Sequence, residues 1–241
     1  MNKIEFISLL HKAFKENNLS NLISDEIAEK LYSFANLLVE TNKITNLTAI
    51  TDDKGIILKH FIDCVSVSEY IGTGAKVIDV GCGAGFPSIP LAIIRPDLSI
   101  TALDSTGKKI DFVKTAALKL NLTNLTAVCA RAEDFAAESR ESFDVSTSRA
   151  VARLNVLAEI SLPLVRVGGK FIAMKSSKGA EEFAEAKTGI NKLGATLEAF
   201  AEKTFSLDDE NINREFYLFC KTRSTPNEFP RKYSQILKKP L

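Results

Sequence analysis

The sequence predicts a doubly wound α/β fold, in which helices cover both faces of an open, mostly parallel sheet. From Lys76 onward, short β-branched runs alternate with longer amphipathic segments, which is typical of right-handed βαβ units. The first of these runs ends in a loop that carries Gly81, Gly83 and Gly85. The last two apolar runs have no helix between them, which predicts an antiparallel pair of strands at one end of the sheet.

The residues before the sheet are predicted to be helical. Apolar side chains recur at helical spacing over 3–15 and 25–40, and Ser24 is suited to cap the second of these helices. A further helical stretch over 55–70 leads to the first strand. We therefore expect residues 1–70 to form a helical N-terminal extension.

The sheet domain is expected to cover residues 71–222 and to be followed by a tail over 223–241, all in one compact unit. Pro87 and Pro90 favour the start of a helix directly after the glycine loop. The expected strands cover 76–80, 99–104, 125–130, 143–147, 170–175, 195–205 and 214–222, and the expected helices cover 88–95, 107–120, 151–166 and 178–193.

Composition limits the class of protein. A chain of 241 residues, 45% hydrophobic and 25% charged, suits one large α/β domain with a small appendage. Its apolar runs fall well short of the ~20 residues of a membrane helix, and its start lacks the layout of a secretion signal. Cys64, Cys82, Cys129 and Cys220 are scattered, with no His at ligand spacing. We expect a soluble cytoplasmic protein without a metal or a disulfide, in which Cys82 and Cys129 are small buried apolar residues.

The C-terminal tail is basic. Between Lys221 and Leu241 there are six Lys or Arg residues against Glu228 alone, in a chain whose net charge is +1. Such a tail can meet a polyanion while the rest of the protein stays slightly acidic. A solvated, disordered terminus explains the charge equally well.

The residues that follow each predicted strand form the candidate site, because ligands of such sheets lie beyond the carboxyl ends of the strands. Gly81 and Gly83 let the backbone approach a ligand closely. Asp104 closes the second strand, where a carboxylate can accept hydrogen bonds from both hydroxyls of a ribose. This pattern predicts a nucleotide-like cofactor. The other candidates are Phe86 after the first strand, Ala132, Glu133 and Asp134 after the third, Ser148 and Arg149 after the fourth, and Lys175 at the end of the fifth.

Each candidate also has a simple structural explanation. The glycines can form a tight turn alone, and Asp104 can be the N-cap of the next helix. Glu133 and Asp134 can belong to a solvated face, and Arg149 can be the structural partner of either of these carboxylates. The joint position of these residues at successive strand ends favours a functional site. The spacing is GxGxG, whereas a nicotinamide-dependent oxidoreductase would need GxGxxG.

Seven short motifs follow one another along almost the whole chain. They are Asn46-Leu-Thr-Ala-Ile, Lys59-His-Phe-Ile-Asp, Gly81-Cys-Gly-Ala-Gly-Phe-Pro, Asp104-Ser, Ser148-Arg-Ala, Met174-Lys and the closing Pro230-Arg-Lys. Together they resemble the bacterial 16S ribosomal RNA guanine-N7 methyltransferase family, also called the glucose-inhibited division protein B family. The chain departs from that family at Thr41, where an aromatic residue is usual, and at Ser88 and Ser176, where glycines are usual.

The resemblance implies the Rossmann-like fold of S-adenosylmethionine-dependent methyltransferases and that cofactor. It places the cofactor on Gly81, Gly83 and Phe86, with Arg149 facing it. The implied ribose contacts are Asp104, Ser105 and Thr106, and the implied adenine contacts are Ala132 and Glu133.

The acceptor implied by the resemblance is N7 of a loop guanine in 16S ribosomal RNA or the small ribosomal subunit, at position 527 of the 530 loop. N7 carries no proton, so in-line attack on the methyl group needs no general base. This agrees with a chain whose only histidines are His11 and His60. Arg149 and Lys175 are the candidate catalytic residues, in positioning roles, and Asn46, His60 and Lys175 are candidate substrate contacts.

Three other functions remain open. A methyltransferase of the same fold can act on another RNA or on a small molecule, and an oxidoreductase shares the sheet. A non-catalytic RNA-binding protein would carry a vestigial pocket and would not bind S-adenosylmethionine. We expect a monomer with no membrane partner.

Overall fold

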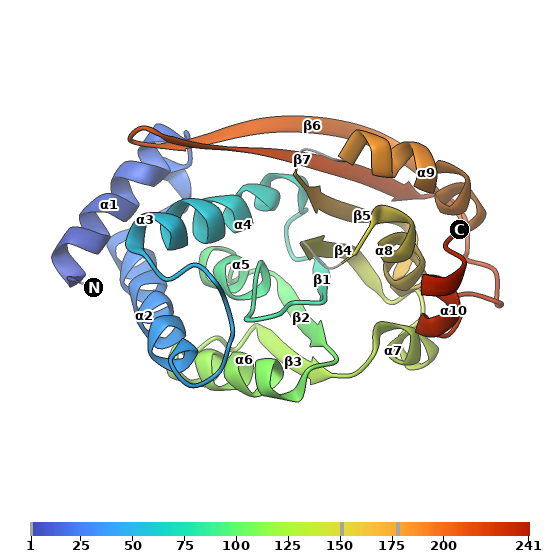
Figure 1. Cartoon of the computed structure of the whole chain (residues 1–241), viewed down its shortest axis with the longest axis horizontal. Helices are drawn as coiled ribbons and strands as arrows, with labels where there is room; N and C mark the ends of the chain where they lie inside the picture. The colour runs from blue at the N-terminus through green and yellow to red at the C-terminus, as the bar shows by residue number, and fades with distance from the viewer. Residues whose placement is uncertain (1, 150–151, 177–178) are drawn as a thin grey trace.

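A computed structural model describes residues 2–149, 152–176 and 179–241. Within these residues, seven strands form one sheet in the order β3-β2-β1-β4-β5-β7-β6, with helices on both faces (Figure 1). All neighbouring strands up to β5 are parallel, whereas β7 runs antiparallel to both β5 and β6. The predicted fold class is therefore confirmed.

The strands alternate with helices through the first half of the sheet, as predicted. The strands are β1 Lys76–Val80, β2 Ser99–Asp104, β3 Leu125–Cys129, β4 Phe143–Arg149, β5 Val165–Lys175, β6 Ala195–Leu207 and β7 Glu210–Lys221. The α-helices are α1 Lys3–Glu16, α2 Asp25–Asn42, α3 Asp53–Gly55, α4 Asp63–Val65, α5 Ser88–Ile94, α6 Gly107–Lys119, α7 Ala132–Glu138, α8 Leu154–Ser161, α9 Gly179–Lys192 and α10 Tyr233–Lys238.

The N-terminal helices pack directly against the sheet domain. Ser24 caps α2, as expected, by accepting a hydrogen bond from the Ile27 amide. Phe34 on α2 is fully buried, and its ring centroid lies 5.9 Å from that of Phe61 and 5.3 Å from that of Phe86. Phe61 belongs to a π-helical turn over Ile56–Ile62, between α3 and α4. The N-terminal extension therefore shares its apolar core with the end of the glycine loop.

Two predictions between β3 and β5 were wrong. The helix expected over 151–166 covers only Leu154–Ser161, followed by a 3₁₀ turn, because the chain from Val165 pairs with β4 instead. The helix α7 was not predicted, since seven residues give too short a periodic pattern to recognise. The first residues of the helices expected at 151 and 178 lie outside the described residues.

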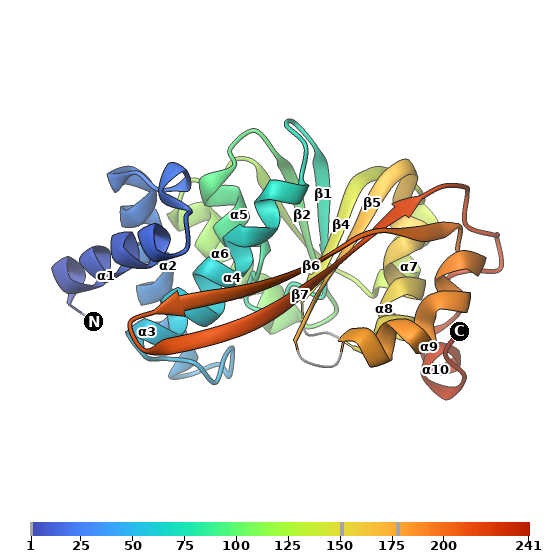
Figure 2. The same ribbon diagram turned by 90° about the horizontal axis from the view of Figure 1, so that it is seen from above.

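The terminal hairpin is longer than expected. β6 and β7 continue to a tight turn at Asp208, whose φ of +52° is left-handed. There the Asp208 carboxylate pairs with Lys12 of α1 and Lys54 of α3, so that the turn is attached to the N-terminal helices. Figure 2 shows the hairpin crossing from the α9 end of the molecule to the α1 end. These long-range ion pairs are not visible in the local sequence pattern.

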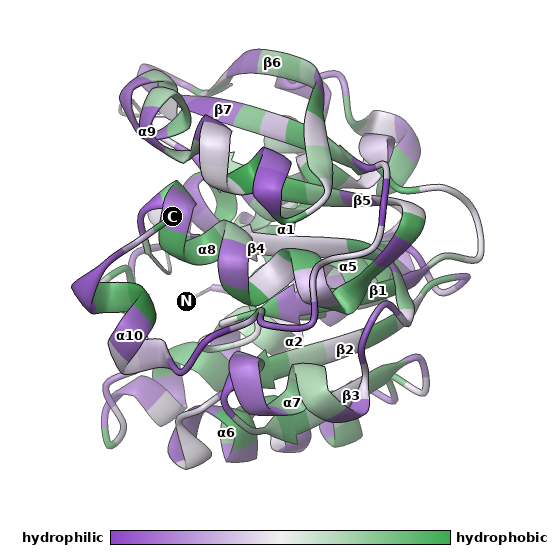
Figure 3. Cartoon of the chain, turned by 90° about the vertical axis from the view of Figure 1, so that its right-hand side faces the viewer, coloured by the Kyte–Doolittle hydropathy of each residue, from purple (hydrophilic) through white to green (hydrophobic). Residues whose placement is uncertain are grey.

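The C-terminal tail is ordered, so the alternative of a disordered terminus was wrong. Its helix α10 lies beside α8 and carries both hydrophilic and hydrophobic residues (Figure 3). Phe229 and Ile236 are buried, whereas Lys238 and Lys239 are exposed. Among the described residues, no helix has the length and apolar character needed to cross a membrane.

Candidate functional site

The glycine loop leaves β1 in a conformation that only glycine adopts easily. Gly81, Gly83 and Gly85 have φ values of +76°, +58° and +89°. The amides of Gly81 and Cys82 both donate to the Leu103 carbonyl of β2, at 2.8 and 3.0 Å. The loop is thereby fastened to the neighbouring strand while its other face stays open to a pocket.

Gly83 and Gly85 provide a matched pair of substitutions. A Cβ at position 85 would lie 2.4 Å from the buried Ile89 side chain, whereas a Cβ at position 83 would meet nothing within 4 Å. We expect Gly85→Ala to lower the free energy of unfolding by about 2–4 kcal/mol, and Gly83→Ala by only about 1 kcal/mol, since Gly83→Ala suffers the left-handed strain alone. Urea denaturation measures this difference. Equal losses in the two variants would contradict it.

Asp104 organises the glycine loop and does not act only as a helix cap. Its Oδ2 accepts a hydrogen bond from the Gly83 amide at 3.0 Å, and its Oδ1 accepts one from the Thr106 amide at 2.8 Å. The N-cap of α6 is Thr106. A carboxylate has about four acceptor positions, so Asp104 retains capacity for hydroxyl donors.

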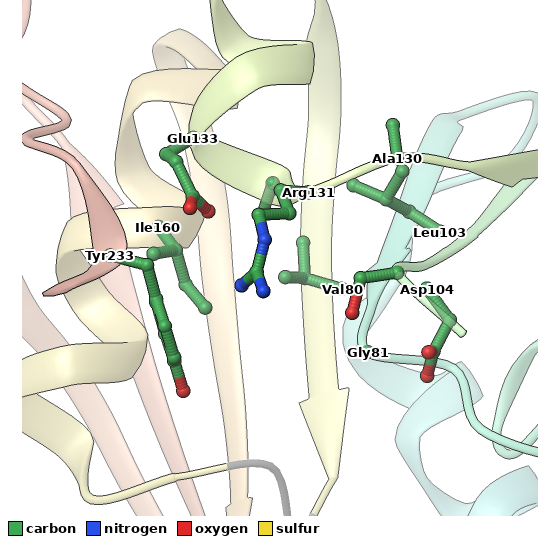
Figure 4. Close-up of a pocket in the computed structure, with 11 residues that line it drawn as sticks. Val80, Gly81, Leu103, Asp104, Ala130, Arg131, Glu133, Ile160 and Tyr233 are labelled. Atoms are coloured by element: carbon green, nitrogen blue, oxygen red, sulfur yellow. The ribbon is translucent and has the colours of Figure 1, made fainter.

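A pocket of about 530 Å³ opens on one side of Asp104, at the carboxyl ends of β1, β2 and β3. Asp104 and Glu133 lie on opposite sides of it (Figure 4). Ser105 and Ala132, which were expected to contact the cofactor, line it as well. The structure also brings Arg131 of the β3–α7 connection and Tyr233 of α10 to this pocket; sequence reasoning missed both (Figure 4).

A second pocket, of about 730 Å³, lies on the other side of Asp104. The expected residues Gly83 and Phe86 line it, together with Thr48 of the N-terminal extension. Gly81 and Asp104 line both pockets. The two pockets therefore form a continuous groove along the carboxyl edge of the sheet, which suits an elongated ligand.

The loop after α2 covers the second pocket. Asn42 holds this loop, because its Oδ1 accepts hydrogen bonds from the amides of Leu47 and Thr48 at 2.7 and 3.0 Å. Leu47 and Thr48 line the pocket. Asn46, the expected substrate contact, is exposed just outside it and is not among the described residues that line these pockets.

His60 is buried and neutral. Arg149 Nη2 must donate to Nδ1 of His60, at 3.1 Å, so Nε2 carries the imidazole proton and donates to Thr48 Oγ1 at 3.0 Å. Burial, and then the positive charges of Arg149 and Arg214, lower the pKa of His60 to about 3. The ring also stacks on Phe86, with centroids 4.2 Å apart. Both ring nitrogens are therefore engaged, so that His60 links Arg149 to the loop at Thr48.

Arg149 joins this groove to a buried ion cluster. Its Nη1 lies 3.0 Å from Asp63 Oδ2, and its guanidinium lies over the Phe86 ring at 5.1 Å. Asp63 is only 1% exposed and also binds Arg214 of β7 at 3.0 Å. The structural alternative, in which Arg149 partners Glu133 or Asp134, was wrong, because its carboxylate partner is Asp63 of α4. Arg149 lines the second pocket and, on its other side, a third pocket.

The pocket beyond Arg149 contains Lys175. This third pocket, of about 820 Å³, is lined by charged side chains from α4, β4, β5, α9 and β7. Lys175 is 9% exposed; its Nζ donates to the Ala152 carbonyl at 2.7 Å and pairs with Glu182 at 2.7 Å. Sequence reasoning missed Arg214, which lies on β7 far from Lys175 in the chain, and also Glu182, which lies on α9 shortly after Lys175.

The cysteines differ from one another. Cys82 is buried, as expected, and burial raises the pKa of its thiol. Cys129 is exposed, so its expected burial was wrong; it is the last residue of β3, where the strand edge meets solvent. Among the described residues, no group of three or more His, Cys, Asp or Glu side chains is arranged to hold a metal ion.

Asp79 is a fully buried carboxyl group beneath the glycine loop. Its Oδ2 accepts a hydrogen bond from the Ser88 amide at 3.1 Å, whereas its Oδ1 has no partner among the described residues. Burial raises the pKa of Asp79 to about 7. The folded chain therefore keeps Asp79 protonated to a much higher pH than the unfolded chain does.

Asp79 should make stability depend on pH. Asp79 ionises near pH 3.8 in the unfolded chain but near pH 7 in the folded chain. The contribution of Asp79 to the free energy of unfolding is therefore complete below pH 3.8 and is lost as the pH rises to about 7. We expect Asp79→Asn, which stays neutral, to remove this loss and to be more stable than the wild type by about 2–4 kcal/mol at pH 8. Urea denaturation between pH 5 and pH 8 measures it. A difference that does not change with pH would contradict the expectation.

Comparisons with known proteins agree on one family. The family model described as rRNA small subunit methyltransferase G (GidB) matches residues 27–212. A protein of Staphylococcus carnosus named ribosomal RNA small subunit methyltransferase G is 45% identical over 91% of this chain and 92% of its own. Its namesake in Staphylococcus haemolyticus is 43% identical over 100% of this chain and 99% of its own.

Similar solved structures include more distant proteins. TYW2 of M. jannaschii, crystallised in complex with AdoMet, has a TM-score of 0.53 and 15% identity, and the match covers 67% of this chain and 76% of that one. TYW2 of P. horikoshii, in complex with MeSAdo, also has a TM-score of 0.53, with coverage of 66% and 62%. At this identity the likeness shows a shared fold.

Proposed function

Because this chain belongs to the rRNA small subunit methyltransferase G (GidB) family, we propose that it transfers the methyl group of S-adenosylmethionine to N7 of a loop guanine in 16S ribosomal RNA. The proposed target is position 527 of the 530 loop, as the resemblance to the family implies. The observation that carries the proposal is the groove around Asp104, which continues past Arg149 into the charged pocket at Lys175. One end suits the cofactor and the other suits a polar base.

The groove offers the groups that the cofactor needs. Asp104 accepts hydrogen bonds from the ribose hydroxyls. Glu133, at the far side of the first pocket, accepts a hydrogen bond from the adenine amino group. The open backbone at Gly81 and Gly83 takes the methionine part. When bound, S-adenosylmethionine supplies a sulfonium methyl group that is reactive toward a lone pair.

No residue of the groove needs to remove a proton. The lone pair of guanine N7 lies in the plane of the base and carries no hydrogen, so a positioned base attacks directly. His60 is neutral, with both ring nitrogens in hydrogen bonds. The rate enhancement then comes from alignment of guanine N7 with the methyl group and from exclusion of water, and the buried side chains that line the groove are suited to both.

The charged pocket beyond Arg149 suits a guanine. Guanine presents the acceptor O6 beside N7, and Lys175 and Arg214 are donors that line this pocket. Glu182, which pairs with Lys175 at 2.7 Å, is an acceptor in the same pocket, to which the N1–H and the amino group of guanine can donate. Lys175 is held by Ala152 and Glu182, so its ammonium group has a defined position before substrate arrives.

The target guanine must leave its stack to reach this pocket. The major groove of A-form RNA is too deep and narrow for side chains, which favours a loop base that splays out. Exposed lysines of the C-terminal segment, at positions 232, 238 and 239, are candidates to hold the RNA backbone. Their contribution should weaken with salt. We propose that the protein acts as a monomer in the cytoplasm, where ribosomal RNA is found.

A methyl-transfer experiment tests the proposal. Purified protein is incubated with labelled S-adenosylmethionine and small ribosomal subunits that lack the modification, and N7-methylguanine is mapped by chemical strand cleavage. Label at one guanine of the 530 loop supports the proposal. Label at another RNA site would contradict the proposed target. A lack of label in any ribosomal RNA would overturn the proposed function.

A further inference from the structure

The C-terminal segment is fastened to the sheet domain by buried charges. Arg140 donates to the carbonyls of Thr225, Pro226 and Phe229, at 2.5, 3.0 and 2.8 Å. Glu159 of α8 is fully buried, so a fixed partner for its charge is essential. The hydrogen bonds of Arg140 hold the start of the C-terminal segment in place, and the next residues of the segment provide the partner of Glu159.

Arg231 is that partner of Glu159. Its backbone N, Nε and Nη2 donate to the Glu159 carboxylate at 3.0, 2.7 and 2.5 Å. Ile160, directly after Glu159, lines the pocket beside Asp104. Two residues after Arg231 the chain reaches Tyr233, the first residue of α10. The ion cluster thereby fixes Tyr233 relative to the wall of this pocket.

Tyr233 forms part of the pocket wall itself. Its ring stands beside Ile160, on the side away from Asp104, and the Arg131 side chain points into the pocket between Tyr233 and Val80 (Figure 4). The Arg131 guanidinium lies over the Tyr233 ring, 5.6 Å from its centroid. A flat, polarisable group thus already occupies the face of this ring.

We propose that Tyr233 is a cofactor-binding residue, whose ring takes the face of the adenine in the place now held by the Arg131 guanidinium. The inference rests on S-adenosylmethionine being the cofactor, and not on the identity of the RNA target. The C-terminal segment then completes the cofactor site, in addition to carrying the exposed lysines. A flat base needs an aromatic face and apolar walls, which Tyr233, Ile160 and Val80 supply, with Glu133 as the polar group.

Calorimetric titration of the full chain with S-adenosylhomocysteine tests this role. We expect Tyr233→Ala to weaken binding about tenfold, since stacking on a base contributes about this much, and Tyr233→Phe to bind within about twofold of the wild type because it keeps the ring. Gln235→Ala, an exposed position on the same helix and outside this pocket, is the matched control and should bind like the wild type. Circular dichroism confirms that each variant is folded.

Tyrosine fluorescence separates stacking from a structural role. The chain has four tyrosines and no tryptophan, and among the described residues Tyr233 is the tyrosine that lines this pocket. Ligand should quench the fluorescence of the wild type, and this quench should be absent in Tyr233→Phe although its affinity is kept. Full affinity in folded Tyr233→Ala, or an unchanged quench in Tyr233→Phe, would overturn the inference. Ligand binding with these changes but without methylation of ribosomal RNA would instead overturn the proposed function alone.

Discussion

Asp104→Ala is expected to weaken S-adenosylmethionine binding by at least about 100-fold. The carboxylate accepts hydrogen bonds from the amides of Gly83 and Thr106, and it is proposed to accept the ribose hydroxyls as well. Hydrogen bonds to a charged acceptor contribute about 1.5–3 kcal/mol each, so the loss of two exceeds the ~2.7 kcal/mol that corresponds to 100-fold. Calorimetric titration measures the affinity directly.

The control for Asp104 is Asp111→Ala. Asp111 is an exposed carboxylate on α6 and is not among the described residues that line the groove. This variant carries the same change of charge and should bind S-adenosylmethionine like the wild type. A loss of less than about fivefold in Asp104→Ala would mean that the loop is organised by its glycines and by Leu103 alone.

Arg149→Ala is expected to reduce methyl transfer by more than about 100-fold, since a displaced methyl donor or base loses its alignment. Arg149 holds His60, contacts Phe86 and lines both the cofactor groove and the Lys175 pocket. The same variant should lower the free energy of unfolding by about 3 kcal/mol, because it leaves Asp63 buried with one partner fewer. Single-turnover transfer at saturating cofactor, together with urea denaturation, measures both effects.

Arg214→Ala separates these two effects. It also removes one of the two arginines that bind Asp63, so its cost in stability should be similar. Arg214 does not line the cofactor groove. We therefore expect cofactor affinity to fall in Arg149→Ala and to be kept in Arg214→Ala. Equal losses of cofactor affinity in the two variants would show that Arg149 affects the cofactor groove only through the stability of the cluster.

The sequence predicted the part of the site that is built from strand ends. Gly81, Asp104 and Glu133 follow three successive strands, and parallel strands bring their carboxyl ends to one edge. Once the strands are recognised, the meeting of these residues follows from topology. The length of β5 and the helix α7 did not follow, because pairing with a neighbouring strand and a short amphipathic turn leave a weak local pattern.

The contacts that hold Arg149 are of a different kind. Asp63 and Arg149 are 86 residues apart in the chain, and Asp63 and Arg214 are 151 apart. A charged residue in a sequence has many partners of opposite sign available to it. Only the packing of α4 against β4 and β7 selects one of them.

The sequence by itself determined the strands of the sheet, its glycine loop and the acid that closes the second strand, because local periodicity and a preference for positive φ depend on residues near one another. The motifs along the chain also determined its family. Tertiary structure alone decided that His60 is neutral, that Asp63 joins two arginines and that Tyr233 of the basic tail reaches the pocket beside Asp104. These properties depend on burial and on contacts between distant segments, which arise only when the helical extension and the tail pack against the sheet.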